Sequence, residues 1–289
     1  MSVLLVDEFM SEEKEMSFLD HLEELRWHVV RAVAAIFIMM ILAFIYTEEI
    51  FHYIIFAPGR IDFITFRWLC DLGASTGVDG LCVTEIPMKI QSRFLMGQFT
   101  MQLTASFIIG LIVAFPYVVW ELWSFIRPGL YSKEKKGSKG AVFSISLLFL
   151  IGISFGYFIL SPMTIAFLAN YSISDMISNE FDITSYVSTI SILVLSSGIL
   201  FQLPIVIFFL TKVGIVTPKL LRSYRKHAVV AILVIGAVIT PSSDPLSLSL
   251  ISIPLYFLYE ISILISKIEL RRKEKREKEE EKLDQQSSV

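Results

Sequence analysis

Six apolar segments constrain this chain more than any other feature of its sequence. A helix needs about 20 mostly apolar residues to cross a hydrocarbon core of about 30 Å. The candidate spans are Val29–Tyr46, Phe99–Phe125, Ala141–Leu160, Ser185–Leu210, Ala228–Ile239 and Leu246–Ser266. The sequence therefore predicts an all-α polytopic membrane protein with six transmembrane helices.

The composition excludes several other classes of protein. Only 18% of the residues are charged and 54% are apolar, whereas a soluble domain carries roughly 25% charged residues. The net charge of −3 argues against a nucleic-acid partner, because such a protein needs a basic face. Two cysteines exclude a disulfide-dense secreted scaffold and a four-cysteine zinc site.

Positive charge predicts how the spans are oriented, since loops on the cytoplasmic side are rich in Lys and Arg. Of the 25 Lys and Arg residues, 21 lie in segments that six spans place on one side of the membrane. The other four lie in the long loop Thr47–Gln98. We expect both termini in the cytoplasm and this loop outside.

The two ends of the chain are both charged, and they flank a single predicted domain at residues 17–266. Residues 1–16 contain five acidic side chains, the reverse of the positive start of a signal peptide, so the first span should remain as an uncleaved anchor. Residues 267–289 mix Lys and Arg with Glu. That pattern is typical of a solvated helix and tail, with a role at the membrane surface as the alternative.

The fifth span is unusually short. Ala228–Ile239 has 12 residues, which cover about 18 Å and fall well short of a bilayer core of about 30 Å. The turn Thr240–Pro245 joins it to a sixth span that carries several serines. We expect a short antiparallel helix hairpin that thins the bilayer locally.

Three polar residues fall within the spans: Glu121, Gln202 and Glu260. A carboxylate in a bilayer is costly and usually faces protein or water. For Glu121 and Glu260, near the cytoplasmic ends of their spans, a helix-packing hydrogen bond competes with a functional role. Gln202 lies two residues before Pro204, where its amide could cap freed carbonyls or line a polar cavity.

Two cytoplasmic segments carry candidate acidic groups. Ser17–Val29 predicts an amphipathic helix whose polar stripe holds His21, Glu24 and His28. Three such residues on one helix, with no fourth ligand, are weak evidence for a metal site. An acidic face at the cytoplasmic membrane surface is the better interpretation. Glu134 lies in a basic loop, where it either neutralises neighbouring lysines or binds a cationic ligand.

The two cysteines, Cys70 and Cys82, both fall in the outer loop. In an oxidising compartment they could form a disulfide that stabilises the loop by about 3 kcal/mol; the alternative is two unpaired thiols. We expect this loop to be a folded cap without a catalytic role.

The segment FLDHLEELR, from Phe18 to Arg26, contains the pattern H-L-x-E-L-R. It resembles the entry motif of the TatC family, the multispanning subunit of the twin-arginine (Sec-independent) protein translocase. The second span and the loop after it are similar to the family at five places: Phe115–Pro116, Trp123, Phe125, Pro128–Tyr131 and Glu134–Lys136. Later matches, in order, are Phe201–Pro204, Leu221–Arg222, Thr240–Pro241 and Tyr259–Glu260.

The resemblance implies a receptor for signal peptides that carry a consecutive Arg-Arg pair on folded cargo proteins. It assigns that pair to Glu24 and Glu134, with His21, Leu25 and Arg26 as supporting residues. A carboxylate suits the task because guanidinium binds it through a two-pronged fork that lysine cannot copy. The apolar part of the signal would lie against the concave, glove-like face of the bundle.

The resemblance also implies the setting in which the chain works. Its partners would be single-span TatA/TatB-like subunits, membrane lipid and further copies in a larger receptor complex, all in the cytoplasmic (inner) membrane. The proton gradient would drive transport. The sequence has no G-x-x-x-x-G-K-[ST] phosphate loop and no catalytic constellation, so we expect neither enzymatic activity nor a cofactor or metal.

One departure from the family concerns the intramembrane polar residues. Family members often carry Glu at the Gln202 position and usually Gln near the Glu121 position, so this chain has the two exchanged. If the two side chains face one another across the cavity, a single carboxylate survives on the other helix. This hypothesis puts in doubt any proton-linked role for position 202.

Two other classes of function compete with the receptor. A small-solute secondary transporter would show a mid-membrane site on broken helices together with internal pseudo-symmetry, and neither is evident in the sequence. An assembly or structural membrane protein without a receptor role is the second alternative.

Overall fold

The computed structural model describes residues 18–77, 82–126, 138–174, 179–239 and 245–287. Most of this part of the chain is helical. The helices of the row are α1 (Phe18–Ile45), α4 (Gly97–Ile126), α5 (Ser138–Phe155), α7 (Ile183–Leu200), α8 (Leu203–Val213), α10 (Arg225–Ile239) and α11 (Pro245–Ser287). The other helices are α2 (Thr47–Ile50), η2 (Phe51–Ile55), η3 (Ala57–Gly59), α3 (Ile64–Thr76), η6 (Gly156–Leu160), α6 (Ser161–Asn170) and α9 (Pro218–Ser223).

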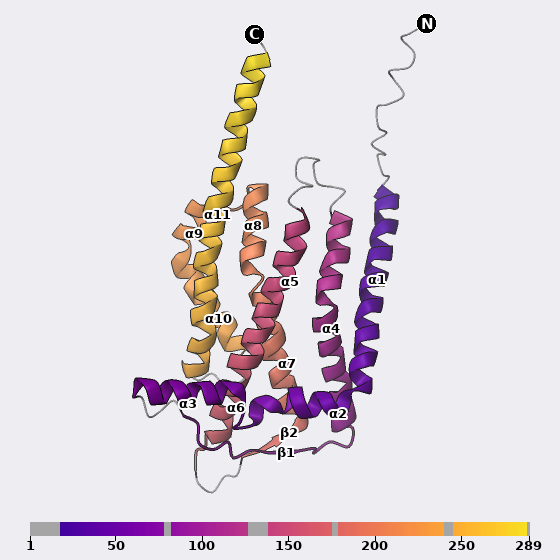
Figure 1. The fold of residues 1–289 in the computed structure, drawn as a ribbon, viewed down its shortest axis with the longest axis vertical. Coiled ribbons are helices and arrows are strands. Elements are labelled where there is room, and N and C mark those ends of the chain that lie inside the picture. Colours follow the sequence, from indigo (N-terminus) through magenta and orange to yellow (C-terminus); the bar gives the residue numbers. More distant parts are fainter. Residues whose placement is uncertain (1–17, 78–81, 127–137, 175–178, 240–244, 288–289) are drawn as a thin grey trace.

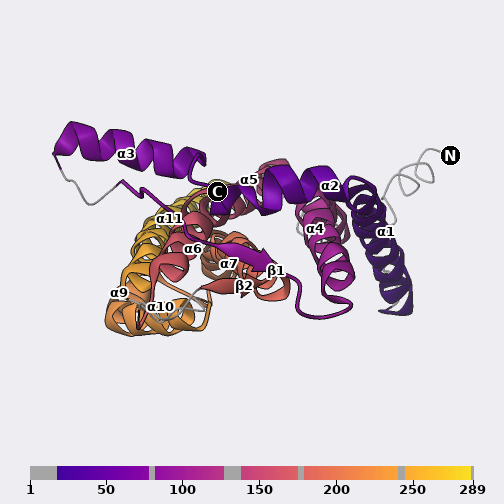
Figure 2. The same cartoon turned by 90° about the horizontal axis from the view of Figure 1, so that it is seen from below.

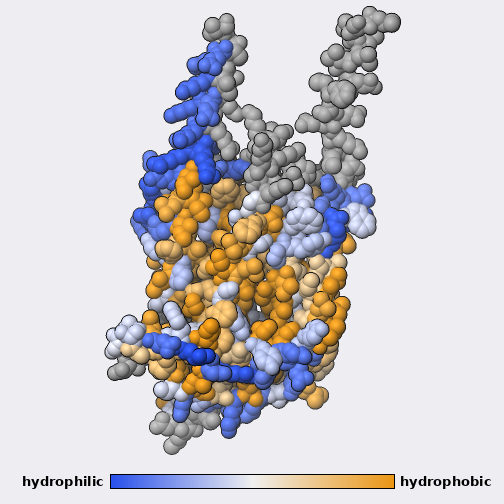
Figure 3. Space-filling view, in the orientation of Figure 1, coloured by the Kyte–Doolittle hydropathy of each residue, from blue (hydrophilic) through white to orange (hydrophobic). Residues whose placement is uncertain are grey.

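Five helical stretches are long and apolar enough to cross a membrane, with mean hydropathy between 1.9 and 2.4. They are Leu22–Ile45, Gly97–Ile126, Gly140–Asn170, Ile183–Val213 and Leu248–Lys275. On the surface they form an apolar band with hydrophilic residues above and below it (Figure 3). The chain is therefore a multi-pass membrane protein. The fifth predicted span, α10, is not among these five; it has 15 residues and covers about 22 Å.

The spanning helices stand side by side in a row (Figures 1 and 2). α1 packs on α4, α4 on α5 and α7, and α8 and α10 on α11. α1 is continuous from Phe18, so the predicted amphipathic helix and the first span form one element. His28 of the predicted polar stripe contacts Glu121 of α4.

Glycines set the closest helix contacts. A Cβ at Gly110 on α4 would lie 2.6 Å from the backbone nitrogen of Met40 on α1. Gly152 of α5 faces Gly198 of α7, and a Cβ at Gly152 would lie 2.6 Å from the carbonyl oxygen of Ser197. One turn later, a Cβ at Gly156 of η6 would lie 2.8 Å from the Cα of Val194 on α7. Helices in lipid associate through such close packing of small residues.

Two prolines free helical carbonyls that distant hydroxyl groups then satisfy. Pro58 leaves the carbonyl of Ile54 without its usual donor, and the Tyr157 hydroxyl donates to that oxygen at 2.9 Å. Pro162 likewise frees the carbonyl of Phe158, which accepts a hydrogen bond from Thr65 of α3. These bonds connect the segment between α1 and α4, called the outer segment below, to the row of membrane helices.

The fourth span is broken and the sixth is not. α7 ends at Leu200 and α8 begins at Leu203, with Pro204 in its first turn. In contrast, α11 runs unbroken through Pro254. The prolines of the sequence predict breaks in both the fourth and the sixth helix; the break is confirmed at Pro204 and is wrong for Pro254, which lies inside a continuous helix.

The outer segment is a folded layer beneath the row, and it departs from the all-α prediction. β1 (Lys89–Gln91) pairs in parallel with β2 (Glu180–Asp182). Asp182 caps α7 by accepting from the backbone N–H of Thr184 at 2.8 Å, and it also accepts from the backbone N–H of Arg93 at 2.9 Å. The hydrogen bond from the Thr184 hydroxyl, followed by these backbone bonds, holds the pKa of Asp182 below its usual range.

A disulfide closes the same layer. Cys70 of α3 is bonded to Cys82, with the two Cα atoms 4.3 Å apart. α3 ends at Gly77, whose φ of 71° lies in the left-handed region that favours glycine.

α10 and α11 pack against each other as the predicted helix hairpin. Ile232 of α10 is buried with Ile251 and Leu255 of α11. An ion pair between Arg225 and Glu260, 2.7 Å apart, joins the two helices farther along. Residues 240–244 of the predicted turn lie outside the described residues.

The α5–α7 contact predicts a sharp difference between two glycines of α5. Gly152→Ala should lower the melting temperature of the purified protein, because the new methyl group meets the α7 backbone and overpacking costs about 1–3 kcal/mol. Gly140→Ala is the control, since nothing lies within 4 Å of its added Cβ. Equal melting temperatures for both variants would contradict the close contact.

The lowered pKa of Asp182 predicts an acid-sensitive cap. Its contribution is fully present above the unfolded-state pKa of about 3.9 and is lost as pH falls through the lower folded-state pKa. In wild type, protection of the Arg93 amide against hydrogen exchange should fall over that range. Asp182→Asn should weaken the protection of the Arg93 amide at pH 6 and remove much of its pH dependence. Asp62→Asn, at an exposed position, is the control and should change neither.

The disulfide predicts that no thiol reacts with a maleimide unless a reductant is added first. After reduction, two thiols per chain should react, because the chain has only two cysteines. Labelling of the unreduced, folded protein would show that the bridge is not formed. Mass spectrometry of the intact protein gives the count directly.

Candidate functional site

Glu24 lies on the second turn of α1 and has a spare carboxylate oxygen. Its side chain is partly buried, and its Oε2 atom is enclosed with no hydrogen-bond partner among the described residues. His28 and Arg31 lie four and seven residues farther along, so all three share one face of the helix. That face meets α4.

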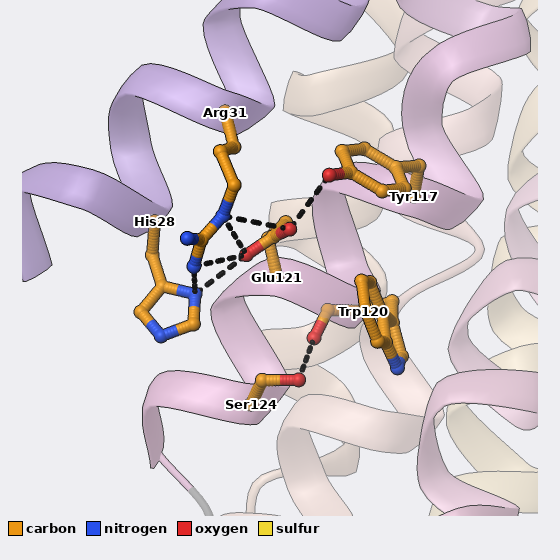
Figure 4. Close-up of polar contacts among 6 residues, drawn as sticks. All are labelled: His28, Arg31, Tyr117, Trp120, Glu121 and Ser124. Atoms are coloured by element: carbon orange, nitrogen blue, oxygen red, sulfur yellow. Dashed lines mark hydrogen bonds and ion pairs between the residues drawn. The ribbon is translucent and has the colours of Figure 1, made fainter. Parts of the chain in front are cut away.

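Glu121 of α4 is the centre of the largest polar cluster between these helices (Figure 4). Its side chain is 3% exposed. The guanidinium of Arg31 binds both carboxylate oxygens, with Nε 3.1 Å from Oε1 and Nη2 3.1 Å from Oε2. His28 Nδ1 lies 2.5 Å from Oε2, and the Tyr117 hydroxyl donates to Oε1 at 2.7 Å. We call Glu121, Arg31, His28 and Tyr117 the Glu121 cluster.

Arg31 and the Tyr117 hydroxyl donate to Glu121. His28 Nδ1 lies within hydrogen-bond distance of both Glu121 Oε2 and Arg31 Nη2, the latter at 2.9 Å, so the tautomer of His28 determines whether Nδ1 donates or accepts. Arg31 supplies a positive charge, which compensates for burial of the carboxylate. The Glu121 carboxylate thus has partners at both oxygens, whereas the Oε2 atom of Glu24 has none among the described residues.

Arg26, two residues after Glu24, makes its contacts within α1. Arg26 forms an ion pair with Glu23, 3.3 Å apart, and its guanidinium carbon lies 5.4 Å from the centre of the Trp27 ring. Leu25 is partly buried. Arg26 therefore contacts its own helix.

Glu134 and the side chain of His21 lie outside the described residues. α4 ends at Ile126 and α5 begins at Ser138, so the segment with Glu134 follows the end of the helix that carries Glu121. The structure does not test the assignment of Glu134 as a binding residue.

Gln202 and Glu121 make separate contacts. Gln202 donates from Nε2 to the carbonyl oxygen of Ile145 on α5 at 3.2 Å, and its Oε1 has no partner among the described residues. The partners of Glu121 lie on α1 and α4. The pairing on which the exchange hypothesis depends is thus absent from the hydrogen bonds of the described residues.

Glu260 belongs to a second cluster at the far end of the row. It pairs with Arg225 and accepts from the Tyr256 hydroxyl at 3.1 Å. The arrangement repeats the Arg–Glu–Tyr chemistry of the Glu121 cluster on different helices. Glu260 and Glu121 both bond to an arginine on the neighbouring helix, as expected for polar residues that help helices to pack.

Sequence reasoning missed Arg31 and Tyr117 as site residues, and it placed His28 in a surface stripe. A usable signal was present. His28 and Arg31 are three apart near the start of the first span, and Tyr117 and Glu121 are four apart near the end of the second, which an antiparallel pair of spans brings to the same level. Complementary polar pairs at one depth favour contact in lipid.

Comparison with known proteins identifies relatives along most of the chain. Residues 20–254 match the family model described as Sec-independent protein translocase protein (TatC). The TatC protein of Blattabacterium sp. is 40% identical over 89% of this chain and 97% of its own length. TatCy of Bacillus subtilis is 33% identical over 90% of this chain and 92% of its own length.

Two solved structures share the fold. Both are titled as crystal structures of the twin arginine translocase receptor TatC. One superposes with a TM-score of 0.64 at 29% identity and covers 86% of this chain and 99% of its own. The other, in DDM, gives a TM-score of 0.67 at 30% identity, with 85% and 99% covered.

These matches give no support to a small-solute transporter. They cover nearly the whole membrane domain, and the relatives share its length. The chain belongs to the TatC family of Sec-independent protein translocase proteins.

Proposed function

We propose that this protein is the receptor subunit of a twin-arginine protein translocase, and that Glu24 and Glu134 bind the Arg-Arg pair of a cargo signal peptide. The carrying observation is the spare carboxylate of Glu24. Its Oε2 is enclosed and lacks a hydrogen-bond partner among the described residues. An enclosed acceptor without a donor is costly, and an arriving guanidinium removes that cost.

Two carboxylates on separate elements suit a pair of adjacent arginines. Each guanidinium offers a planar fork that matches a carboxylate, and hydrogen bonds between charged groups are roughly twice as strong as neutral ones. Lysine offers a point charge without the fork. The receptor therefore prefers Arg-Arg to Lys-Lys. The apolar part of the signal then lies against the apolar face of the helix row.

The proposed topology has six crossings with both termini in the cytoplasm. The start of α1 and the end of α11 lie on the same side of the row, opposite the outer layer (Figure 1). Five crossings would leave them on opposite sides, so α10 supplies the sixth despite its 15 residues. The concentration of Lys and Arg on that side supports a cytoplasmic location.

The remaining parts of the proposal follow from family membership. Single-span TatA/TatB-like subunits assemble with this chain, several copies join in a larger receptor complex, and the proton gradient drives cargo across the inner membrane. The broken fourth span and the α10–α11 hairpin are the candidate contact surfaces for these subunits. The protein acts by binding and transport rather than by catalysis.

The binding role of Glu24 predicts a difference between two adjacent glutamates. Glu24→Gln should weaken binding of a twin-arginine signal peptide by about ten- to a hundredfold, since hydrogen bonds to charged groups contribute about 1.5–3 kcal/mol. Glu23→Gln is the matched control, because Glu23 is 66% exposed and already paired with Arg26. Titration of labelled peptide into protein in lipid nanodiscs measures both.

A Lys-Lys version of the same peptide completes the design. Wild type should bind it at least about tenfold more weakly, a difference of 1.4 kcal/mol. Equal affinity for the two peptides, or equal effects of the Glu23 and Glu24 variants, would overturn the assignment. Glu134→Gln, measured in parallel, tests the second proposed carboxylate.

A further inference from the structure

We propose that the Glu121 cluster is a positioning device that holds α1 against α4, so that Glu24 stays in a fixed place relative to α4. This inference rests on the proposed function of Glu24. It concerns Glu121, Arg31, His28 and Tyr117, which do not contact the cargo themselves.

The two helices run in opposite directions, because Arg31 of α1 meets Glu121 of α4 whereas Met40 lies against Gly110. Glu24 precedes His28 by four residues, which is about 6 Å along the helix axis at 1.5 Å per residue. α4 ends at Ile126, five residues or about 7.5 Å beyond Glu121. The cluster therefore lies at a similar distance from Glu24 and from the end of α4.

α1 needs such an attachment because it is the most exposed of the spanning helices. Only 11% of its apolar window is buried, compared with 22–33% for the other four. The residues of α1 described as buried are Ala32 and Ala43, both small. The close contact of Met40 with Gly110 holds the outer half of the helix. At the cytoplasmic half, the cluster supplies the interhelical hydrogen bonds (Figure 4).

The contacts of Glu121 separate its role from that of Glu24. Both of its oxygens are engaged, by Arg31, His28 and Tyr117, and the side chain is 3% exposed. A cargo arginine would have to displace an existing guanidinium to reach it. Glu24 keeps an oxygen with no partner among the described residues, so the arriving arginine binds there and the cluster determines where Glu24 stands.

The test combines a distance measurement with a binding measurement. Spin labels at Val30→Cys and Leu122→Cys, both exposed positions on the two helices, report the α1–α4 separation without any peptide. Glu121→Ala should broaden the distance distribution and weaken twin-arginine peptide binding about tenfold, or 1.4 kcal/mol. Glu121→Gln keeps one acceptor oxygen, so it should have a smaller effect on both and remains usable if the alanine variant does not fold.

Two further variants make the result specific. Exchanging the charges, Arg31→Glu together with Glu121→Arg, should restore the distance distribution and bring the affinity within about threefold of wild type, a difference under 1 kcal/mol. Glu260→Ala is the matched control, since it breaks the similar Arg–Glu–Tyr cluster on α10 and α11. It should change neither the α1–α4 distance nor the peptide affinity.

Each outcome decides between positioning and another role. An unchanged distance distribution in Glu121→Ala overturns the proposal, whatever happens to binding. Lost binding with unchanged distances would instead make Glu121 a direct contact of the cargo. If wild type does not bind the peptide at all, the proposed function fails, and the distance measurement still shows whether the cluster positions α1.

Discussion

The structure depends on the rule that backbone polar groups in lipid must find partners within the protein. Helices satisfy most of them, and prolines create the exceptions. Where Pro58 and Pro162 free a carbonyl, the hydroxyl groups of Tyr157 and Thr65 supply the missing donor. The same bonds connect the outer layer to the membrane helices. The need of each freed carbonyl for a donor is thus met by a residue far away in the sequence.

The sequence predicted the spans well because hydropathy is a local property. α4 begins and ends within two residues of the predicted Phe99–Phe125, and α10 ends at the predicted Ile239. The predicted short helix hairpin also formed, since a span of 12 residues and a tight turn leave few alternatives. Each of these features depends on residues close together in the chain.

The features that sequence reasoning missed all depend on distant partners. β1 and β2 pair residues that are about ninety positions apart, and Glu121 meets Arg31 across a similar separation. Neither pairing leaves a periodic pattern in its own segment. The unbroken course of α11 through Pro254 was also missed, because proline has the same local chemistry there as at the break before Pro204. Glu24 was identified from a motif, while its enclosed oxygen became evident only in the structure.

A buried charge can serve stability or binding, and its donors determine which. Glu121 is surrounded by donor groups and forms part of the contact between two helices. Glu24 lies on the same face of α1, one turn from His28, and keeps an oxygen unpartnered among the described residues. In the proposed function, the satisfied Glu121 holds α1 in place and the unsatisfied Glu24, one turn from His28 on the same helix, receives the ligand. Preorganisation of this kind reduces the entropy lost on binding, and it requires that the two carboxylates do not exchange roles.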